Sequence, residues 1–217
     1  MPLIDLSQPL YHHCPNCPAH PLITSRNIAN YPREGWRVEE LTLTPHAGSH
    51  VDAPMHKFIQ GKSIDQMPLE RFTGEAYIAD LRKHDCARGI TEEMLAHALP
   101  GDLAGKIVLL ATGWGDRRER TQDWLHEGPG LTREGAIWLA QRQINGVGID
   151  YYSVGGPHEP CNTQVHEVLL GEEIWILEEL RFPAEAFKVK QPAVLWALPV
   201  HLKGASGAFC RPVLVGE

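Results

Sequence analysis

The chain has 217 residues, 43% of them hydrophobic and 22% charged, and a formal net charge of -7 at pH 7. A chain of this length is expected to form one domain, residues 1–217, whose buried core needs no disulfides. The negative charge and the lack of a basic run argue against nucleic acid as a partner, because phosphate contacts require clustered Lys and Arg. No apolar run reaches the roughly 18 residues of a membrane-spanning helix, so we expect no membrane contact.

The N-terminal sequence MPLIDLSQPLYHH has neither a charged leader nor a long apolar stretch, so we predict a cytoplasmic protein without a signal peptide. The five cysteines are odd in number and irregularly spaced, which favours reduced thiols. The proline-rich sequence CPNCPAHP that follows is expected to form an irregular arm. Its two cysteines, Cys14 and Cys17, could form half of a zinc site or a redox pair, but we favour free thiols at the entrance of a pocket.

The next distinctive segment is HAGSHVDAPMH, residues 46–56, which holds three histidines and an aspartate, all at even positions. A helix is excluded because a glycine and a proline interrupt the segment. In a strand, His50 and Asp52 would share one face about 6.6 Å apart, close enough to bind the same metal ion. In a fully extended chain His46 would lie about 13 Å from His50, which is too far for ligand bonds near 2 Å.

A bend must therefore bring these side chains together. Gly48 is the position where a bend is least costly, and Pro54 ends the strand and turns His56 back. We predict a strand end with a kinked loop on which four side chains converge: His46, His50, Asp52 and His56. Burying them together without a metal would cost several kcal/mol in unpaired polar groups, so the spacing favours a metal or catalytic site. Histidine and carboxylate ligands with no adjacent cysteine favour zinc or manganese.

The remainder of the chain alternates between short apolar runs and two amphipathic segments. In chain order we predict a strand at 76–81, a helix at 91–99, a strand at 106–114, a helix at 132–146, and strands at 146–154, 174–180, 193–202 and 212–215. Thr91 and Thr132 are the expected N-caps of the helices, and Gly146 the expected C-cap of the second helix. The pattern predicts a single α/β domain with a mixed β-sheet and helices packed on it.

The segment HAGSHVDAPMH also resembles the HxGTHxDxPxH signature of the cyclase family of metal-dependent hydrolases, with Ser49 in place of the usual Thr. That family includes bacterial kynurenine formamidases (arylformamidases) and isatin hydrolases. The resemblance extends to IDLSQPL, GIDYYSV and LPVHLKGASGAFCRPVLV, and so to nearly the whole chain. It implies a swivelling β/β/α fold, a homodimer or homotetramer, and a small-molecule carbonyl substrate.

The resemblance further implies one or two divalent metal ions per chain. The implied ligands are three histidines and two carboxylates: His46, His50, Asp52, His166 and Glu178. Asp52 would bridge the two ions, and His56 would be the catalytic residue that transfers a proton. Physical chemistry alone does not select His166 over His158, or Glu178 over Glu172 and Glu173. Asp150, at the end of a predicted strand, is a candidate for orienting a ligand.

These features predict an enzyme that hydrolyses a non-peptide carbon–nitrogen bond with metal-activated water. The expected substrate is an N-formyl arylamine or a small cyclic amide or lactone, and zinc is the default metal with manganese as the alternative. Kynurenine formamidases typically carry a tryptophan where this chain has Cys17. Kynurenine formamidase proper is therefore the alternative and not the leading prediction. A metal- or ligand-binding protein without turnover is an alternative of another class, although a free His56 beside the metals argues against it.

Overall fold

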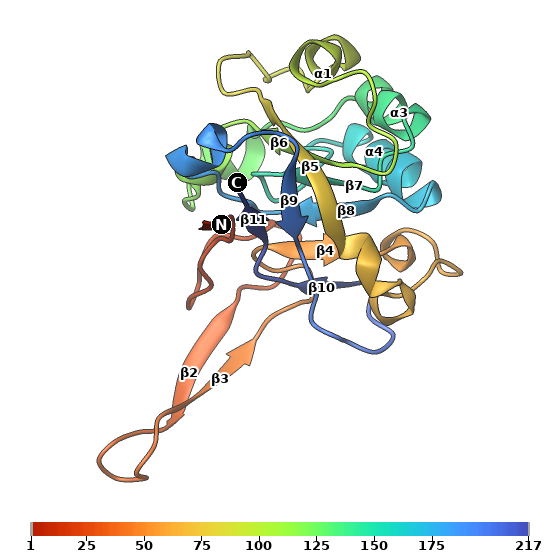
Figure 1. The fold of residues 1–217 in the computed structure, drawn as a ribbon. Helices are drawn as coiled ribbons and strands as arrows, with labels where there is room; N and C mark the ends of the chain where they lie inside the picture. Colours follow the sequence, from red (N-terminus) through yellow and green to blue (C-terminus); the bar gives the residue numbers. More distant parts are fainter. Residues whose placement is uncertain (1, 217) are drawn as a thin grey trace.

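Four parallel strands form the middle of a nine-stranded mixed sheet in the computed structural model, which describes residues 2–216 (Figure 1). They are β5 (Thr73–Asp80), β6 (Ile107–Ala111), β7 (Gly146–Ile149) and β8 (Trp175–Glu178). Every residue of β6, β7 and β8 is buried, as expected for parallel strands covered on both faces. In β6, Val108 and Leu110 belong to one apolar cluster, and Ile107 and Leu109 to the other.

Antiparallel strands extend the sheet on both sides. Beyond β5 lie β9 (Ala193–Trp196), β11 (Val213–Val215) and β1 (Leu3–Asp5), and beyond β8 lie β4 (His50–Asp52) and β10 (Gly207–Phe209). The two ends of the chain therefore pair with each other, and the histidine-rich segment is held between β8 and the C-terminal part of the chain. This architecture confirms the predicted single-domain α/β fold with a mixed sheet.

Helices cover one face of the sheet (Figure 1). They are α1 (Glu92–Ala98), α2 (Gln122–His126), α3 (Arg133–Gln141) and α4 (Cys161–Gly171). The N-caps Thr91 and Thr132 accept backbone hydrogen bonds as predicted, and Thr121 does the same for α2. The chain also contains short 3-10 helices, η1 (Pro54–His56), η2 (Ile64–Gln66), η3 (Leu69–Phe72), η4 (Trp114–Arg117) and η5 (Ala184–Lys188).

The predicted helix at 132–146 is too long at its C-terminal end. Helix α3 ends at Gln141, and the chain turns at Gln143, which has φ of 53°. Gly146 is the first residue of β7 and not a helix cap. A Cβ atom at Gly146 would lie 2.3 Å from the ring of Trp175, so the glycine is required by strand packing. Helices α2 and α4 and strands β1, β2, β3 and β10 were not predicted.

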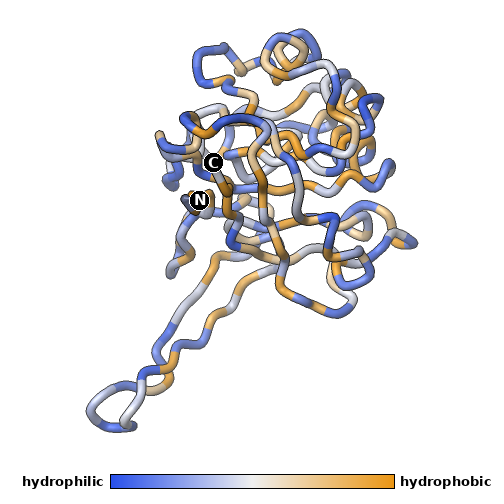
Figure 2. The backbone as a smooth tube through the Cα atoms, viewed as in Figure 1, coloured by the Kyte–Doolittle hydropathy of each residue, from blue (hydrophilic) through white to orange (hydrophobic). Residues whose placement is uncertain are grey.

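A two-stranded hairpin, β2 (Thr24–Ala29) and β3 (Val38–Thr42), projects away from the main sheet (Figure 1). No residue of either strand is buried, whereas the hydrophobic segments elsewhere gather in the central strands (Figure 2). Residues 8–23, which precede the hairpin, contain neither helix nor strand, in agreement with the predicted irregular arm. Within residues 2–216, the helices are all too short or too polar to cross a bilayer.

Candidate metal centre

The histidine-rich segment folds tightly around a short strand. Gly48 adopts φ of +63°, in the left-handed region, and turns the chain before β4, while Pro54 starts η1 and ends the strand. Strand β4 therefore contains only three residues, and the two bends predicted from the sequence are present. They bring Nδ1 of His46 to 2.6 Å from Oδ1 of Asp52, although the two residues lie on opposite sides of the bend.

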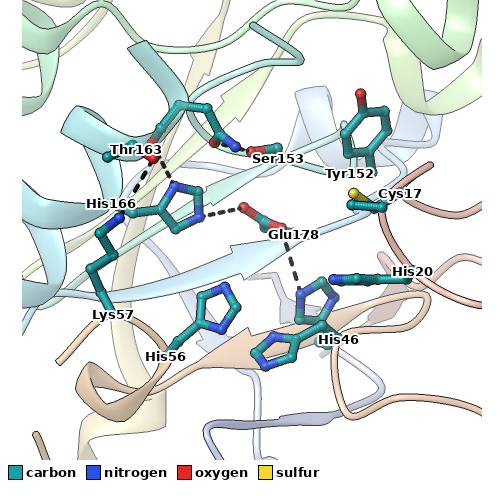
Figure 3. A pocket seen from close by; sticks show the side chains of 13 residues that line it. Cys17, His20, His46, His56, Lys57, Tyr152, Ser153, Thr163, His166 and Glu178 are labelled. Carbon is teal, nitrogen blue, oxygen red and sulfur yellow. Dashed lines mark hydrogen bonds and ion pairs between the residues drawn. The ribbon is translucent and has the colours of Figure 1, made fainter. Parts of the chain in front are cut away.

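Two distant elements complete the cluster. The antiparallel pairing of β4 with β8 places His50 opposite Glu178, and Nε2 of His50 lies 3.5 Å from Oε2 of Glu178. Helix α4 presents His166, whose Nε2 lies 3.5 Å from Oε1 of Glu178 and 3.8 Å from Oδ2 of Asp52. The structure thus brings together all six residues proposed from the sequence, and Figure 3 shows His46, His56, His166 and Glu178 around one cavity.

Backbone carbonyls orient two of the histidines. Nδ1 of His50 donates to the carbonyl oxygen of Gly48 at 2.7 Å, and Nδ1 of His166 donates to that of Asn162 at 2.9 Å. When each ring is neutral, the lone pair on its Nε2 therefore points toward the carboxylates of Asp52 and Glu178, which are also acceptors. Hydrogen-bonded outer nitrogens of this kind are typical of metal-ligating histidines. The arrangement fits a cation held between the rings and the carboxylates.

The charge balance of the cluster supports the same interpretation. Burial lowers the pKa of His50 and His166, but the carboxylates Asp52 and Glu178 outweigh it and raise both values to about 9. Burial raises the pKa of Asp52, but His56, His46 and His50 outweigh it and hold that pKa well below its ordinary value. The two buried carboxylates therefore require positive charge beside them, which either protons or a divalent ion can provide.

Asp52 belongs to two groups of potential ligand atoms that each lie within 4.8 Å of one another: His50, Asp52 and Glu178 form one group, and His46, Asp52 and His56 the other. Its Oδ1 faces His46 and His50, and its Oδ2 faces His166. The carboxylate is therefore placed to contact two neighbouring positions at once. Both ring nitrogens of His46 already have partners, Asp52 and Ser206, so His46 must exchange one contact to bind an ion.

His56 is the exposed member of the cluster. Its ring centroid lies 4.0 Å from that of His46 and 5.8 Å from that of His166. The surrounding protein partly desolvates the ring and lowers its pKa, Asp52 opposes this shift, and His46 and His166 add to it. His56 is therefore predominantly neutral at pH 7. Its position suits a proton carrier, and it is also close enough to Asp52 and His46 to act as a ligand.

The cluster forms the floor of a cavity of about 260 Å³. In Figure 3, Cys17 and His20 lie on one side of Glu178, and Lys57 and His166 on the other. The Cys17 thiol lines the cavity as predicted, and burial raises its pKa to about 11, so it stays protonated at neutral pH. Cys14 does not line the cavity but packs in a small apolar cluster.

Asp150 was predicted to orient a ligand, but the structure gives it different partners. Its buried carboxylate accepts hydrogen bonds from the backbone N–H and hydroxyl of Thr112 and from the N–H of Gly113, and so stabilises that turn. Burial raises its pKa, although these hydrogen bonds oppose the shift. The groups that orient the ligands are backbone atoms instead, including the N–H of Val154, which donates to Oε1 of Glu178 at 2.7 Å. Backbone partners leave no residue-type signal in a sequence.

The fold and this cluster define an α/β protein with a histidine–carboxylate site of the kind that suggests a divalent metal. Residues 4–155 match the family model described as "Putative cyclase", and the chain belongs to that family. The match includes His46, His50, Asp52 and His56 but stops before His166 and Glu178. The predicted resemblance to this family is therefore confirmed.

Individual relatives agree with this assignment. The chain is 31% identical over 177 residues to a kynurenine formamidase of Bordetella pertussis, covering 82% of this chain and 79% of that protein. It is 25% identical to a structure titled as a potential metal-dependent hydrolase with cyclase activity, with a TM-score of 0.78 and coverage of 98% and 96%. Isatin hydrolase A from Labrenzia aggregata shares the fold, with a TM-score of 0.84, 24% identity and coverage of 100% and 94%. These similarities support a hydrolase.

Proposed function

We propose that the protein is a metal-dependent hydrolase that cleaves a non-peptide amide bond, in an N-formyl arylamine or a small cyclic amide, or the ester bond of a lactone. The observation that carries the proposal is the orientation of His50 and His166, whose Nε2 atoms face two buried carboxylates at the floor of a cavity. The relatives named kynurenine formamidase and the neighbours named isatin hydrolase support the reaction class.

The proposed ligands are the five residues suggested by the resemblance: His46, His50, Asp52, His166 and Glu178. Two imidazoles and two carboxylates that converge within a few ångströms suit zinc first and manganese second. When bound, a divalent ion supplies Lewis acidity toward a carbonyl oxygen and lowers the pKa of water. Asp52, whose two oxygens face different histidines, would contact both positions if two ions are present.

His56 would carry the proton in this reaction. It is neutral at pH 7 and open to the cavity, so one ring nitrogen can accept a proton from the attacking water and pass it to the leaving nitrogen. The walls of the cavity, which include Cys17, His20 and Tyr152, would orient the carbonyl group of the substrate above the cluster. Each of these roles belongs to a side chain that already points into or lines the cavity.

Kynurenine formamidase proper is the second candidate function, because several relatives carry that name. Cys17 stands where those enzymes are expected to carry a tryptophan, and in this structure the thiol lies on the cavity wall. The smaller side chain removes the aromatic surface that the resemblance associates with binding N-formylkynurenine. We therefore favour a substrate other than N-formylkynurenine.

A substrate panel tests the proposal. Protein loaded with zinc or manganese should hydrolyse at least one of N-formylkynurenine, simple N-formylanilines, isatin and small lactones, and chelator treatment should abolish the turnover reversibly. Addition of either metal to the stripped protein should restore it. Metal-loaded protein that turns over none of these compounds would instead support a metal- or ligand-binding protein without catalysis.

We also propose a homodimer or homotetramer in which the hairpin contributes a contact. Trp36 and Leu41 are 70% and 55% exposed, and an isolated two-stranded ribbon is only marginally stable in water. Replacing both with serine should lower the mass measured by light scattering to that of a monomer. Ile59, which is 88% exposed on another loop, provides the matched control, and Ile59→Ser should leave the mass unchanged. A wild-type monomer at micromolar concentration contradicts the prediction.

A further inference from the structure

The wall of the cavity depends on a segment that has little structure of its own. Residues 8–23, here called the arm, contain neither helix nor strand, yet they place Cys17, Ala19 and His20 at the cavity. The backbone hydrogen bonds within the arm are few: two close local turns, such as the one from the N–H of His20 to the carbonyl of Cys17, and one joins the N–H of His13 to the carbonyl of Ile23. In Figure 3 the ring of His20 points from the arm toward the histidines of the cluster, and its centroid lies 6.0 Å from that of His46. Something outside the arm must therefore hold it in place.

A buried ion pair provides that anchor. Nη2 of Arg118 lies 2.7 Å from Oε2 of Glu179, and the two side chains are only 4% and 1% exposed. Nη1 of Arg118 donates to the carbonyl oxygen of Pro9 at 2.9 Å, and Nη2 donates to that of Pro15 at 2.7 Å. One guanidinium therefore fastens two points of the arm to one carboxylate, which a planar group with several fixed donors can do.

Glu179 is itself anchored to the metal centre. It directly follows the proposed ligand Glu178, and its N–H donates to the carbonyl of Tyr151 at 2.8 Å. Its carbonyl accepts the hydroxyl of Ser49 at 2.6 Å, and Ser49 also accepts the N–H of Gln8, the first residue of the arm, at 2.8 Å. Glu179 adopts φ of 53°, a conformation that a non-glycine residue keeps only when its surroundings hold it.

We infer that the Arg118–Glu179 pair is a positioning device, here called the latch, which locks the arm onto the metal centre and thereby forms the substrate-facing wall that carries Cys17 and His20. Neither latch residue lines the cavity. Burying an ion pair gives little net stability compared with apolar packing, so stability alone does not account for it. The inference deepens the proposed function, on which the kinetic test below rests, while the labelling test is independent of any activity.

The labelling test measures the exposure of Cys17. Arg118→Lys keeps the charge, but the single ammonium group of lysine cannot contact two carbonyls and a carboxylate in the way that a planar guanidinium does. We expect the rate of maleimide modification of Cys17, resolved by peptide mass spectrometry, to rise by about tenfold or more as the arm opens locally. Cys161, which is partly buried at the start of α4, is the internal reference and should keep its rate. Arg117→Lys, at an exposed neighbouring position, is the matched control and should change neither rate.

Glu179→Gln breaks the latch from its other side and should produce the same selective rise at Cys17. If the pair only stabilises the fold, both variants should lower the melting temperature while the ratio of Cys17 to Cys161 labelling in the folded protein stays at its wild-type value. That result would overturn the inference whether or not a substrate has been found. If one of the two variants does not fold, the other is used for the test, because each variant changes only one residue of the pair.

The kinetic test uses whichever compound of the panel is hydrolysed. Arg118→Lys should raise KM by about tenfold or more with metal content unchanged and a smaller effect on kcat, because misplacement of positioning groups is costly. His20→Ala should do the same, and the double variant should be no worse than the more severe single variant, since both changes act through the arm. Additive effects on KM, or a loss of metal in Arg118→Lys, would contradict the latch. Absence of any substrate would count against the proposed function and leave the labelling result valid.

Discussion

Asp52→Ala is expected to be the most damaging single substitution in the protein. It should remove bound metal and lower kcat by at least about 10³-fold, because metal stabilisation is worth several kcal/mol and each 1.4 kcal/mol corresponds to a tenfold change in rate. The reason lies in the geometry, since Asp52 alone faces three of the histidines: His46, His50 and His166. Elemental analysis of the purified variant, together with turnover on the best substrate, measures both effects.

Asp52→Asn separates charge from shape in the same experiment. The amide keeps the volume of the side chain but loses its negative charge, so it should lose metal almost as completely as alanine does. Asp123→Ala is the surface control, because the Asp123 side chain is 75% exposed, and it should retain both metal and activity. Full metal content in Asp52→Ala would show that the metal is held elsewhere and would refute the proposed ligand set.

His56→Ala is expected to have the second-largest effect, but of a different kind. If His56 carries the proton, kcat should fall by about 10²- to 10⁴-fold while metal content stays near that of the wild type. The pH dependence should change as well. The pKa of His56 lies below its ordinary value, so the wild type should lose activity at acidic pH as this ring becomes protonated, and the variant should lack that step.

His50→Ala is the matched comparison for His56→Ala. His50 is buried and its Nε2 faces both carboxylates, so its loss should reduce metal content and activity together. Two outcomes would reject the proton-carrier role of His56. A loss of metal in His56→Ala equal to that in His50→Ala would make it a ligand, as its proximity to His46 and Asp52 allows. A mild loss of kcat with an unchanged pH profile would make it a residue that only positions Asp52.

Local features of the structure followed from the sequence because short-range sterics control them. The bends at Gly48 and Pro54 come from the backbone preferences of those two residues, and they suffice to gather four side chains within eleven positions. The threonine caps and the buried central strands likewise follow from residue types that act over a few positions. The predicted C-cap at Gly146 was wrong because that glycine is required by contact with Trp175, which lies far away in the sequence.

The remaining half of the site was decided by tertiary structure. His166 lies on α4, which begins after Pro160 without a side-chain cap, and so carries none of the usual start signals. Glu178 becomes a partner of His50 only through the register between β4 and β8, and family resemblance, not residue chemistry, pointed to it. Arg118 and Glu179 look like surface charges in the sequence, and their burial as a pair depends on how the arm packs against Arg118.

The sequence by itself therefore determined the strand core, two helix starts and the local cluster at 46–56, because each depends on neighbours within a few residues. Only the tertiary structure determined how that cluster is completed, which backbone carbonyls orient His50 and His166, and what holds the arm over the cavity. The physical reason is the same in each case. A charged or imidazole side chain has the same sequence signature on the surface and in a site, and only the surrounding fold sets its burial and its partners.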